Sequence, residues 1–186
     1  MFGNNSAGVE TEINRLVPKS LNVFVWRVKR RRIPVRAELD KRGIDLDSVR
    51  CPMCDDSLET IEHAMILCKF AYEIWVRVYR WWSFGNPTNL SIGEIFNGVG
   101  NNIRGEVGKE IWQVVEWVSG YVIWKYRNQK VFQNKETAIP NIVNEIQVKS
   151  YEWISRRSKK LNVEWQQWFI NPSSYVNGAP SRVGIG

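Results

Sequence analysis

The chain has 186 residues, of which 44% are apolar and 10 are tryptophan, so it can bury one substantial core. Its net charge of +7 favours a polyanionic partner. The N-terminal residues lack the apolar core of a signal peptide, and the most apolar stretch, residues 111–124, is too short to span a bilayer. We therefore interpret residues 111–124 as a buried helix and expect no membrane partner.

The first helix is predicted over residues 18–33, after an N-terminal segment (1–11) that is rich in Gly, Asn and Ser and is expected to be disordered. Pro34 ends this helix because proline disfavours helical geometry in the residue before it. A short helix over residues 35–42 should follow and end at Gly43, since glycine is the usual residue at a helix C-terminus.

Most of the charge excess lies in this part of the chain. Residues 12–50 contain 11 Lys or Arg and 5 Asp or Glu, a local net charge of +6. The side chains that we predict to contact nucleic-acid phosphates are Arg27, Lys29, Arg30, Arg31, Arg32 and Arg36. Two alternatives stay open: a solvated basic end of the helix, which the helix dipole also favours, and a nuclear-import signal.

All three cysteines and the single histidine lie in one window, at Cys51, Cys54, His63 and Cys68. Their spacing, C-x2-C-x8-H-x4-C, suits a closed tetrahedral zinc site with thiolate and imidazole ligands. An odd number of cysteines with metal spacing also fits a reducing compartment, so we expect a nuclear or cytoplasmic protein. The sequence therefore predicts a structural Zn²⁺ held by these four residues.

The alternatives to zinc are three buried thiols with a surface histidine, a disulfide or redox site, and a Cys-His catalytic dyad. A closed shell of four ligands leaves no free nucleophile, which argues against catalysis. His63 and Cys68 are five residues apart, so an unbroken α-helix would separate them by roughly 140° around its axis. We therefore expect the helix to bend or end near Leu67.

Four further helical segments are predicted downstream, over residues 69–82, over 91–98, over 106–133 and from about residue 140 onward. The segment 106–133 is apolar almost all round, which predicts a central helix. Ser119 and Gly120 at its middle would allow close packing or a slight kink. A short strand is conceivable only at residues 44–50 or 163–170.

The fold class predicted is mainly α: a small helical domain with a Cys3His zinc knuckle and a C-terminal pair of long helices. Residues 12–85 would form the basic helix and zinc module, and residues 86–170 a tryptophan-rich helical region packed on it. Residues 171–186 have the composition of a flexible tail.

The tryptophans fall into two groups. Helical spacing predicts core packing for Trp75, Trp112, Trp117 and Trp124. Trp81–Trp82 and the segment 165–169 are expected to be partly exposed, because adjacent side chains cannot all face one core. Such exposed rings would stack on unpaired bases, or would form a protein interface or a homo-oligomer contact.

The order of motifs resembles a known family. The helix VFVWRVKRRRIPVRAELDKRGI, then CPMC, then ETIEHAMILCKFAYEIW and a downstream IWKYRNQKVFQNK, is similar to the zinc-binding domain at the C-terminal end of reverse transcriptases of plant LINE-type (non-LTR) retrotransposons. The resemblance implies a Cys3His zinc site at Cys51, Cys54, His63 and Cys68. It also implies contact with element RNA or target DNA during target-primed reverse transcription.

The chain departs from a whole reverse transcriptase, because no polymerase motif of the Tyr/Phe-x-Asp-Asp type occurs and Asp55–Asp56 lies inside the zinc loop. We therefore expect a fragment or a stand-alone copy that is not an enzyme and that binds RNA or DNA. A protein-interaction module with a structural zinc is the alternative, and an enzyme fragment without its catalytic domain is a third.

Overall fold

A computed structural model of the chain describes residues 13–97, 103, 105–159 and 161–177. In chain order its helices are α1 (Lys19–Lys29), α2 (Arg36–Asp40), the π-helical turn η1 (His63–Leu67), α3 (Lys69–Trp81), α4 (Ile92–Asn97), α5 (Glu106–Gln133), α6 (Ile139–Arg157), α7 (Trp165–Ile170) and α8 (Ser174–Asn177). Within the described residues the only β pairing is an isolated antiparallel bridge between Arg50 and Leu58. The prediction of a mainly α-helical fold with a pair of long C-terminal helices is confirmed.

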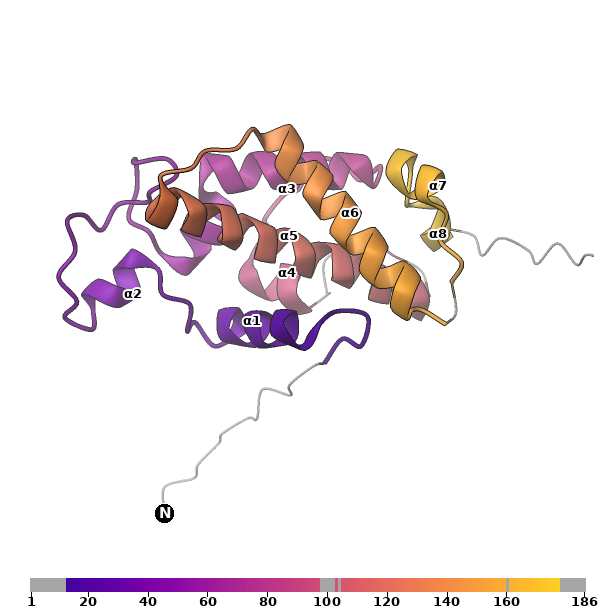
Figure 1. The fold of residues 1–186 in the computed structure, drawn as a ribbon, viewed down its shortest axis with the longest axis horizontal. Helices are drawn as coiled ribbons and strands as arrows, with labels where there is room; N and C mark the ends of the chain where they lie inside the picture. Colours follow the sequence, from indigo (N-terminus) through magenta and orange to yellow (C-terminus); the bar gives the residue numbers. More distant parts are fainter. Residues whose placement is uncertain (1–12, 98–102, 104, 160, 178–186) are drawn as a thin grey trace, which may run out of the picture.

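The long helix α5 lies at the centre of the molecule (Figure 1). It packs against α1, α3, α4, α6, α8 and η1, so every side of its middle section meets another element. This explains why its sequence is apolar almost all round instead of amphipathic. Its bounds agree with the segment predicted from the sequence.

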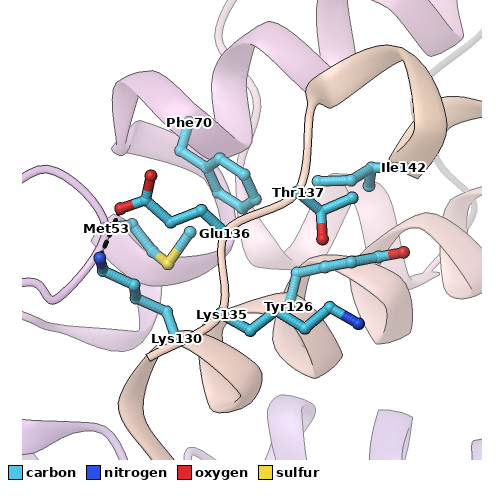
Figure 2. A pocket seen from close by; sticks show the side chains of 8 residues that line it. All are labelled: Met53, Phe70, Tyr126, Lys130, Lys135, Glu136, Thr137 and Ile142. Atoms are coloured by element: carbon cyan, nitrogen blue, oxygen red, sulfur yellow. Dashed lines mark hydrogen bonds and ion pairs between the residues drawn. The ribbon is translucent and has the colours of Figure 1, made fainter. Parts of the chain in front are cut away.

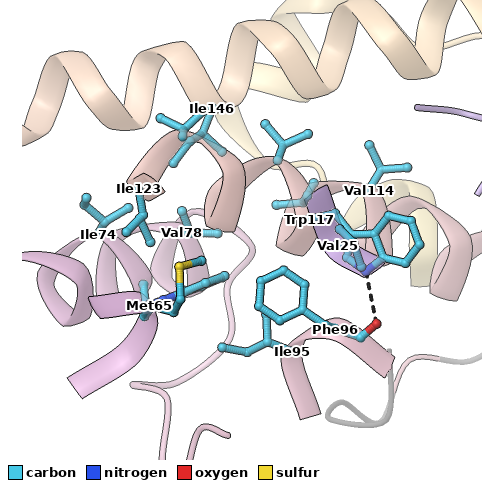
Figure 3. Packing of buried hydrophobic residues seen from close by; sticks show 14 of the residues in the cluster. Val25, Met65, Ile74, Val78, Ile95, Phe96, Val114, Trp117, Ile123 and Ile146 are labelled. Atoms are coloured by element: carbon cyan, nitrogen blue, oxygen red, sulfur yellow. Dashed lines mark hydrogen bonds between the residues drawn. The ribbon is translucent and has the colours of Figure 1, made fainter. Parts of the chain in front are cut away.

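The core surrounds α5, where side chains from α1, η1, α3, α4 and α6 meet it (Figure 3). Phe96 and Trp117 are fully buried there, and the Trp117 indole N–H donates a 3.2 Å hydrogen bond to the Phe96 carbonyl oxygen. A Cβ atom at Gly120 would lie 2.5 Å from Cζ of Phe96. Glycine at this position therefore allows α4 and α5 to approach closely. Close packing at Gly120 is one of the two possibilities that the sequence indicated.

The first helix ends earlier than predicted, at Lys29 instead of Ile33. Arg31 adopts a left-handed backbone conformation with φ of 53°, which turns the chain out of the helix before Pro34 is reached. The short helix α2 ends at Asp40, and Gly43 follows with φ of +74°, a conformation that glycine adopts without strain.

The zinc-loop region and the tryptophan-rich region share one core. Helices α1 and α3 and the turn η1 all pack against α5, and α3 also packs against α6. The predicted disordered segment 1–11 and residues 178–186 of the predicted tail lie outside the described residues. Within the described part of that tail, residues 174–177 form α8.

The two segments predicted as possible short strands differ in the structure. Within the segment 163–170, residues 165–170 form helix α7 instead of a strand, while the end of the segment 44–50 takes part in the isolated bridge through Arg50. Among the described residues, no helix combines the length and the apolar character that crossing a bilayer requires.

Candidate metal centre and basic surface

The first two predicted ligands lie in a tight loop. The backbone N–H of Cys51 donates to the Ser57 carbonyl at 2.8 Å, and the N–H of Asp55 donates to the Cys51 carbonyl at 2.9 Å. Asp55 adopts a positive φ of 55°, which closes the turn. These bonds bring Cys54 back toward Cys51, so that both sulfur atoms can face one ion.

The other two ligands flank the turn η1. Here the N–H of Cys68 donates to the His63 carbonyl at 2.8 Å, an i to i+5 bond that is wider than an α-helical turn. Cys68 itself leaves helical geometry, with ψ of 132°, and α3 begins at the next residue. The expected break near Leu67 is therefore present, and the π turn is the device that returns Cys68 toward His63.

The four ligand atoms come together within 4.8 Å of one another. The sulfur atoms of Cys51 and Cys68 are 3.8 Å apart, and Cys54 Sγ lies 3.2 Å from His63 Nε2. A tetrahedral zinc ion with Zn–S bonds of about 2.3 Å sets ligand atoms about 3.8 Å apart. The donor set and its spacing therefore fit a structural zinc ion.

The surroundings favour the metal-binding form at two of the four ligands, His63 and Cys68. Burial lowers the pKa of His63, which keeps its imidazole neutral at neutral pH. The hydrogen bond from Cys51 lowers the pKa of Cys68, whereas the same bond and burial raise the pKa of Cys51. A thiolate at Cys68 and a neutral imidazole at His63 are the protonation states in which these side chains bind metal.

A buried carboxylate fixes the zinc loop to the rest of the fold. Glu59, between the second and third predicted ligands, is fully buried and accepts hydrogen bonds from Arg127 Nε at 2.7 Å and Arg127 Nη2 at 2.5 Å. Its second oxygen also accepts the backbone N–H of Arg36 at 2.8 Å. One side chain therefore ties the loop to the start of α2 and to α5.

Sequence reasoning did not identify Glu59 or Arg127. The two residues are 68 positions apart, and neither belongs to a recognisable motif. One local signal was present, because Arg127 interrupts the apolar pattern of the central helix at a position that faces inward. A charge at such a position calls for a partner of opposite charge.

The six cations predicted to contact phosphate are not equivalent in the structure. Arg27, Arg30 and Arg32 are exposed around the end of α1. The other three contact groups beyond this end of α1: Lys29 lies 5.6 Å from the Trp117 ring centroid, Arg31 forms an ion pair with Glu62, and Arg36 Nη1 donates to the Arg50 carbonyl at 2.8 Å. Arg27, Arg30 and Arg32 thus face solvent and form no ion pair with a carboxylate among the described residues. Their role in binding stays a prediction.

The tryptophans agree only partly with expectation. Trp75, Trp112 and Trp117 are buried as predicted, and Trp124 is half-buried beneath Arg127. Trp82 and Trp168, which were expected near the surface, are fully buried. They are buried because α7 folds back over the end of α3, where the Trp81 indole N–H donates to the Trp168 carbonyl at 3.1 Å.

Trp26 on α1, which sequence reasoning did not single out, has two cationic neighbours. It is half-buried, and the guanidinium carbons of Arg30 and Arg32 lie 5.8 and 5.6 Å from its ring centroid. Its position in the sequence, directly before Arg27 and three residues before the basic run that starts at Lys29, is a signal that could have drawn attention to it.

A hollow of about 210 Å³ adjoins the zinc turn through Met53 (Figure 2). Three of its polar side chains are engaged with other protein groups: Lys130 forms an ion pair with Glu136, and the Tyr126 hydroxyl donates to Glu145 at 2.8 Å. Burial and this hydrogen bond raise the pKa of Tyr126 to about 12, so the phenol stays neutral. We find no arrangement for general acid–base chemistry among these lining residues.

Comparison with known proteins bears on the same part of the chain. Residues 7–75 match a family model described as zinc-binding in reverse transcriptase, and this range contains all four predicted zinc ligands and the basic helix α1. No curated protein and no solved structure matches the chain. The family match and the Cys3His cluster agree, and residues 7–75 are therefore similar to the zinc-binding domain of reverse transcriptases and hold a structural zinc ion.

Proposed function

We propose that the chain is a non-catalytic nucleic-acid-binding module in which the zinc loop supports a basic surface on α1. The observation that carries this proposal is the charge of the segment 13–37, which contains eight Lys or Arg residues and no Asp or Glu. Arg27, Arg30 and Arg32 project from it into solvent. Exposed arginines of this kind bind phosphates and release counterions from the nucleic acid.

The zinc loop is in direct contact with this basic segment. Arg31 forms an ion pair with Glu62, the residue next to His63, and Arg36 is bonded to the loop through Glu59 and Arg50. A zinc ion with three thiolates and one neutral imidazole carries a net charge of −1, so the site itself does not attract phosphate. Its role in this proposal is to hold the segment that presents the cations.

We further propose that the module derives from a plant LINE-type (non-LTR) retrotransposon and contacts element RNA or target DNA. The matched family description supports a relation to reverse transcriptases, and the motif order described above supports the finer assignment. A nuclear or cytoplasmic location would follow, because free thiolate ligands require a reducing compartment.

The experiment is charge reversal with a matched control. Changing Arg27, Arg30 and Arg32 together to Glu should weaken binding of a labelled oligonucleotide at least 100-fold at low salt, measured by fluorescence anisotropy. Changing Arg77, Arg80 and Arg156 together to Glu makes the same change in net charge on other exposed positions. Equal losses in the two variants would mean that binding is diffuse, and unchanged binding in the first would contradict the proposal.

A second candidate function is self-association through α7. Trp165, Phe169 and Ile170 on this short helix are 39%, 44% and 75% exposed, which is high for large apolar side chains on neighbouring turns. Sedimentation velocity over a range of concentrations tests this candidate. A dimer that is abolished by changing Phe169 and Ile170 to Asp, with oligonucleotide binding unchanged, would separate it from the first function.

A further inference from the structure

The outer face of α1 carries an apolar hollow next to the exposed arginines. It has a volume of about 440 Å³ and is lined by Ile13, Lys19, Asn22, Val23 and Trp26. Ile13 is 68% exposed and Val23 is 49% exposed, so both leave much of their surface to solvent. Apolar surface of this kind next to cations suits a ligand that has both a flat apolar part and a negative charge.

Trp26 connects the hollow to the cationic surface. It lines the hollow, and the guanidinium groups of Arg30 and Arg32 lie near the same ring. Aromatic rings and guanidinium planes are the surfaces on which unpaired nucleobases stack in nucleic-acid-binding proteins. A base placed here would have a stacking surface, while its own phosphate would lie near the arginines.

The amide in the hollow is not available to recognise a particular base. The Asn22 side chain accepts the backbone N–H of Asn14 at 2.9 Å, and it donates to the carbonyl oxygens of Asn14 at 3.0 Å and Pro18 at 3.3 Å. The remaining lining side chains are aliphatic or aromatic, except for Lys19, which would contact phosphate. Contacts in the hollow therefore depend on shape and stacking and not on the hydrogen-bonding edges of a base.

The charge around the hollow favours a polyanion over a neutral apolar peptide. No acidic residue occurs anywhere between Ile13 and Ala37, so nothing on this segment repels a phosphate chain. An apolar peptide would cover the hollow but would leave the arginines without counter-charges. A strand of nucleic acid satisfies both features at once.

We propose that this hollow takes an unpaired nucleobase against Trp26, so that the surface of α1 prefers single-stranded nucleic acid to duplex and is indifferent to base sequence. This inference rests on the proposed function, because Arg27, Arg30 and Arg32 supply the phosphate contacts. Bases in a duplex are stacked within the helix and cannot enter the hollow without being unstacked.

The test compares single-stranded and duplex oligonucleotides of equal length on the zinc-loaded full chain. Trp26→Leu should weaken binding of a single-stranded 15-mer by about 5-fold or more, as expected for the loss of one base–aromatic stack. Binding of the 15-base-pair duplex should change by less than about 2-fold. Trp26→Phe should restore most of the single-strand affinity, because it restores an aromatic face. Trp153→Leu, which alters another half-buried tryptophan with a cationic neighbour, on α6, should affect neither ligand.

The outcomes separate the two proposals. If Trp26→Leu weakens single-strand and duplex binding equally, or weakens neither, the base-stacking inference is wrong while the phosphate surface stands. If the unaltered protein binds neither oligonucleotide, both proposals are wrong. Equal affinities of the unaltered protein for single strand and duplex would also overturn the preference. Melting curves of both Trp26 variants check that α1 remains folded. If Trp26→Leu does not fold, the Trp26→Phe variant still tests the inference.

Discussion

The zinc loop and the central helix are ordered by different physical means. Residues 55–58 of the loop are all exposed, and its shape depends on a few backbone hydrogen bonds and on the Cys3His cluster. The middle of α5 is buried on every side and is ordered by apolar packing. The metal is therefore needed in the zinc loop, where the chain cannot bury enough apolar surface to order itself.

The two regions meet at the buried pair of Glu59 and Arg127. Both side chains are almost fully excluded from solvent, at 0% and 5% exposure. Burying charges is costly, and the cost is offset only when the pair keeps good geometry and its remaining hydrogen bonds. The bidentate contact, together with the Arg36 N–H, meets that condition.

The largest effect should come from loss of the metal. His63→Ala, or removal of zinc by a chelator, should raise hydrogen exchange across residues 36–68 while α5 and α6 stay protected. In small zinc domains the metal supplies on the order of 10 kcal/mol of folding free energy. Cys54→Ser should give the same pattern. A His63→Ala protein that retains one zinc per chain and an unchanged melting curve would show that the ligand assignment is wrong.

The next largest effect should come from breaking the buried pair. Arg127→Met should lower the free energy of unfolding by about 3–5 kcal/mol, because it leaves the Glu59 carboxylate buried without its cation. Lys125→Met on the same helix is the matched control, since its partner Glu145 is partly exposed and such pairs contribute about 0–1 kcal/mol. Denaturant unfolding measures the free energy of unfolding of both variants. Similar losses of free energy in the two would mean that the pair of Glu59 and Arg127 does not join the two regions as described.

The smallest effect should be a dependence on pH within the central helix. Burial raises the pKa of Glu116 well above its ordinary value, although an interaction with the Trp112 indole opposes this in part. In the unfolded chain the carboxyl group of a glutamate such as Glu116 ionises near pH 4.3. The native state therefore loses stability as pH rises from there toward the raised pKa, at about 1.4 kcal/mol per pH unit.

Glu116→Gln removes the ionisable group while keeping nearly the same shape. Its advantage over the unaltered protein in unfolding free energy should grow between pH 6 and pH 8, or reach a plateau if the raised pKa lies within that range. A difference that is absent at every pH would show that the Glu116 carboxylate is accommodated in its charged form.

Local patterns in the sequence predicted most of the fold. Helical periodicity located α3, α5 and α6, because each helix buries a face or its whole surface. The spacing of Cys51, Cys54, His63 and Cys68 predicted zinc, because few other uses require those residue types in one short window. The five-residue separation of the last two predicted the break before α3.

Contacts between distant segments could not be predicted in this way. The burial of Trp82 depends on α7, which follows it by more than 80 residues, and the role of Glu59 depends on Arg127. The exposure of Trp26 depends on which face of α1 meets α4 and α5. Each of these features follows from the tertiary arrangement and not from the periodicity of one helix.

The most direct test of the central claim is a titration of zinc-loaded protein with single-stranded RNA, structured RNA and duplex DNA at several salt concentrations. With three exposed arginines in contact with phosphate, affinity should be micromolar or tighter at low salt. The logarithm of the binding constant should fall with the logarithm of salt concentration with a slope of about −2 to −3. Absence of binding at low salt, from a folded sample with one zinc per chain, would contradict the account.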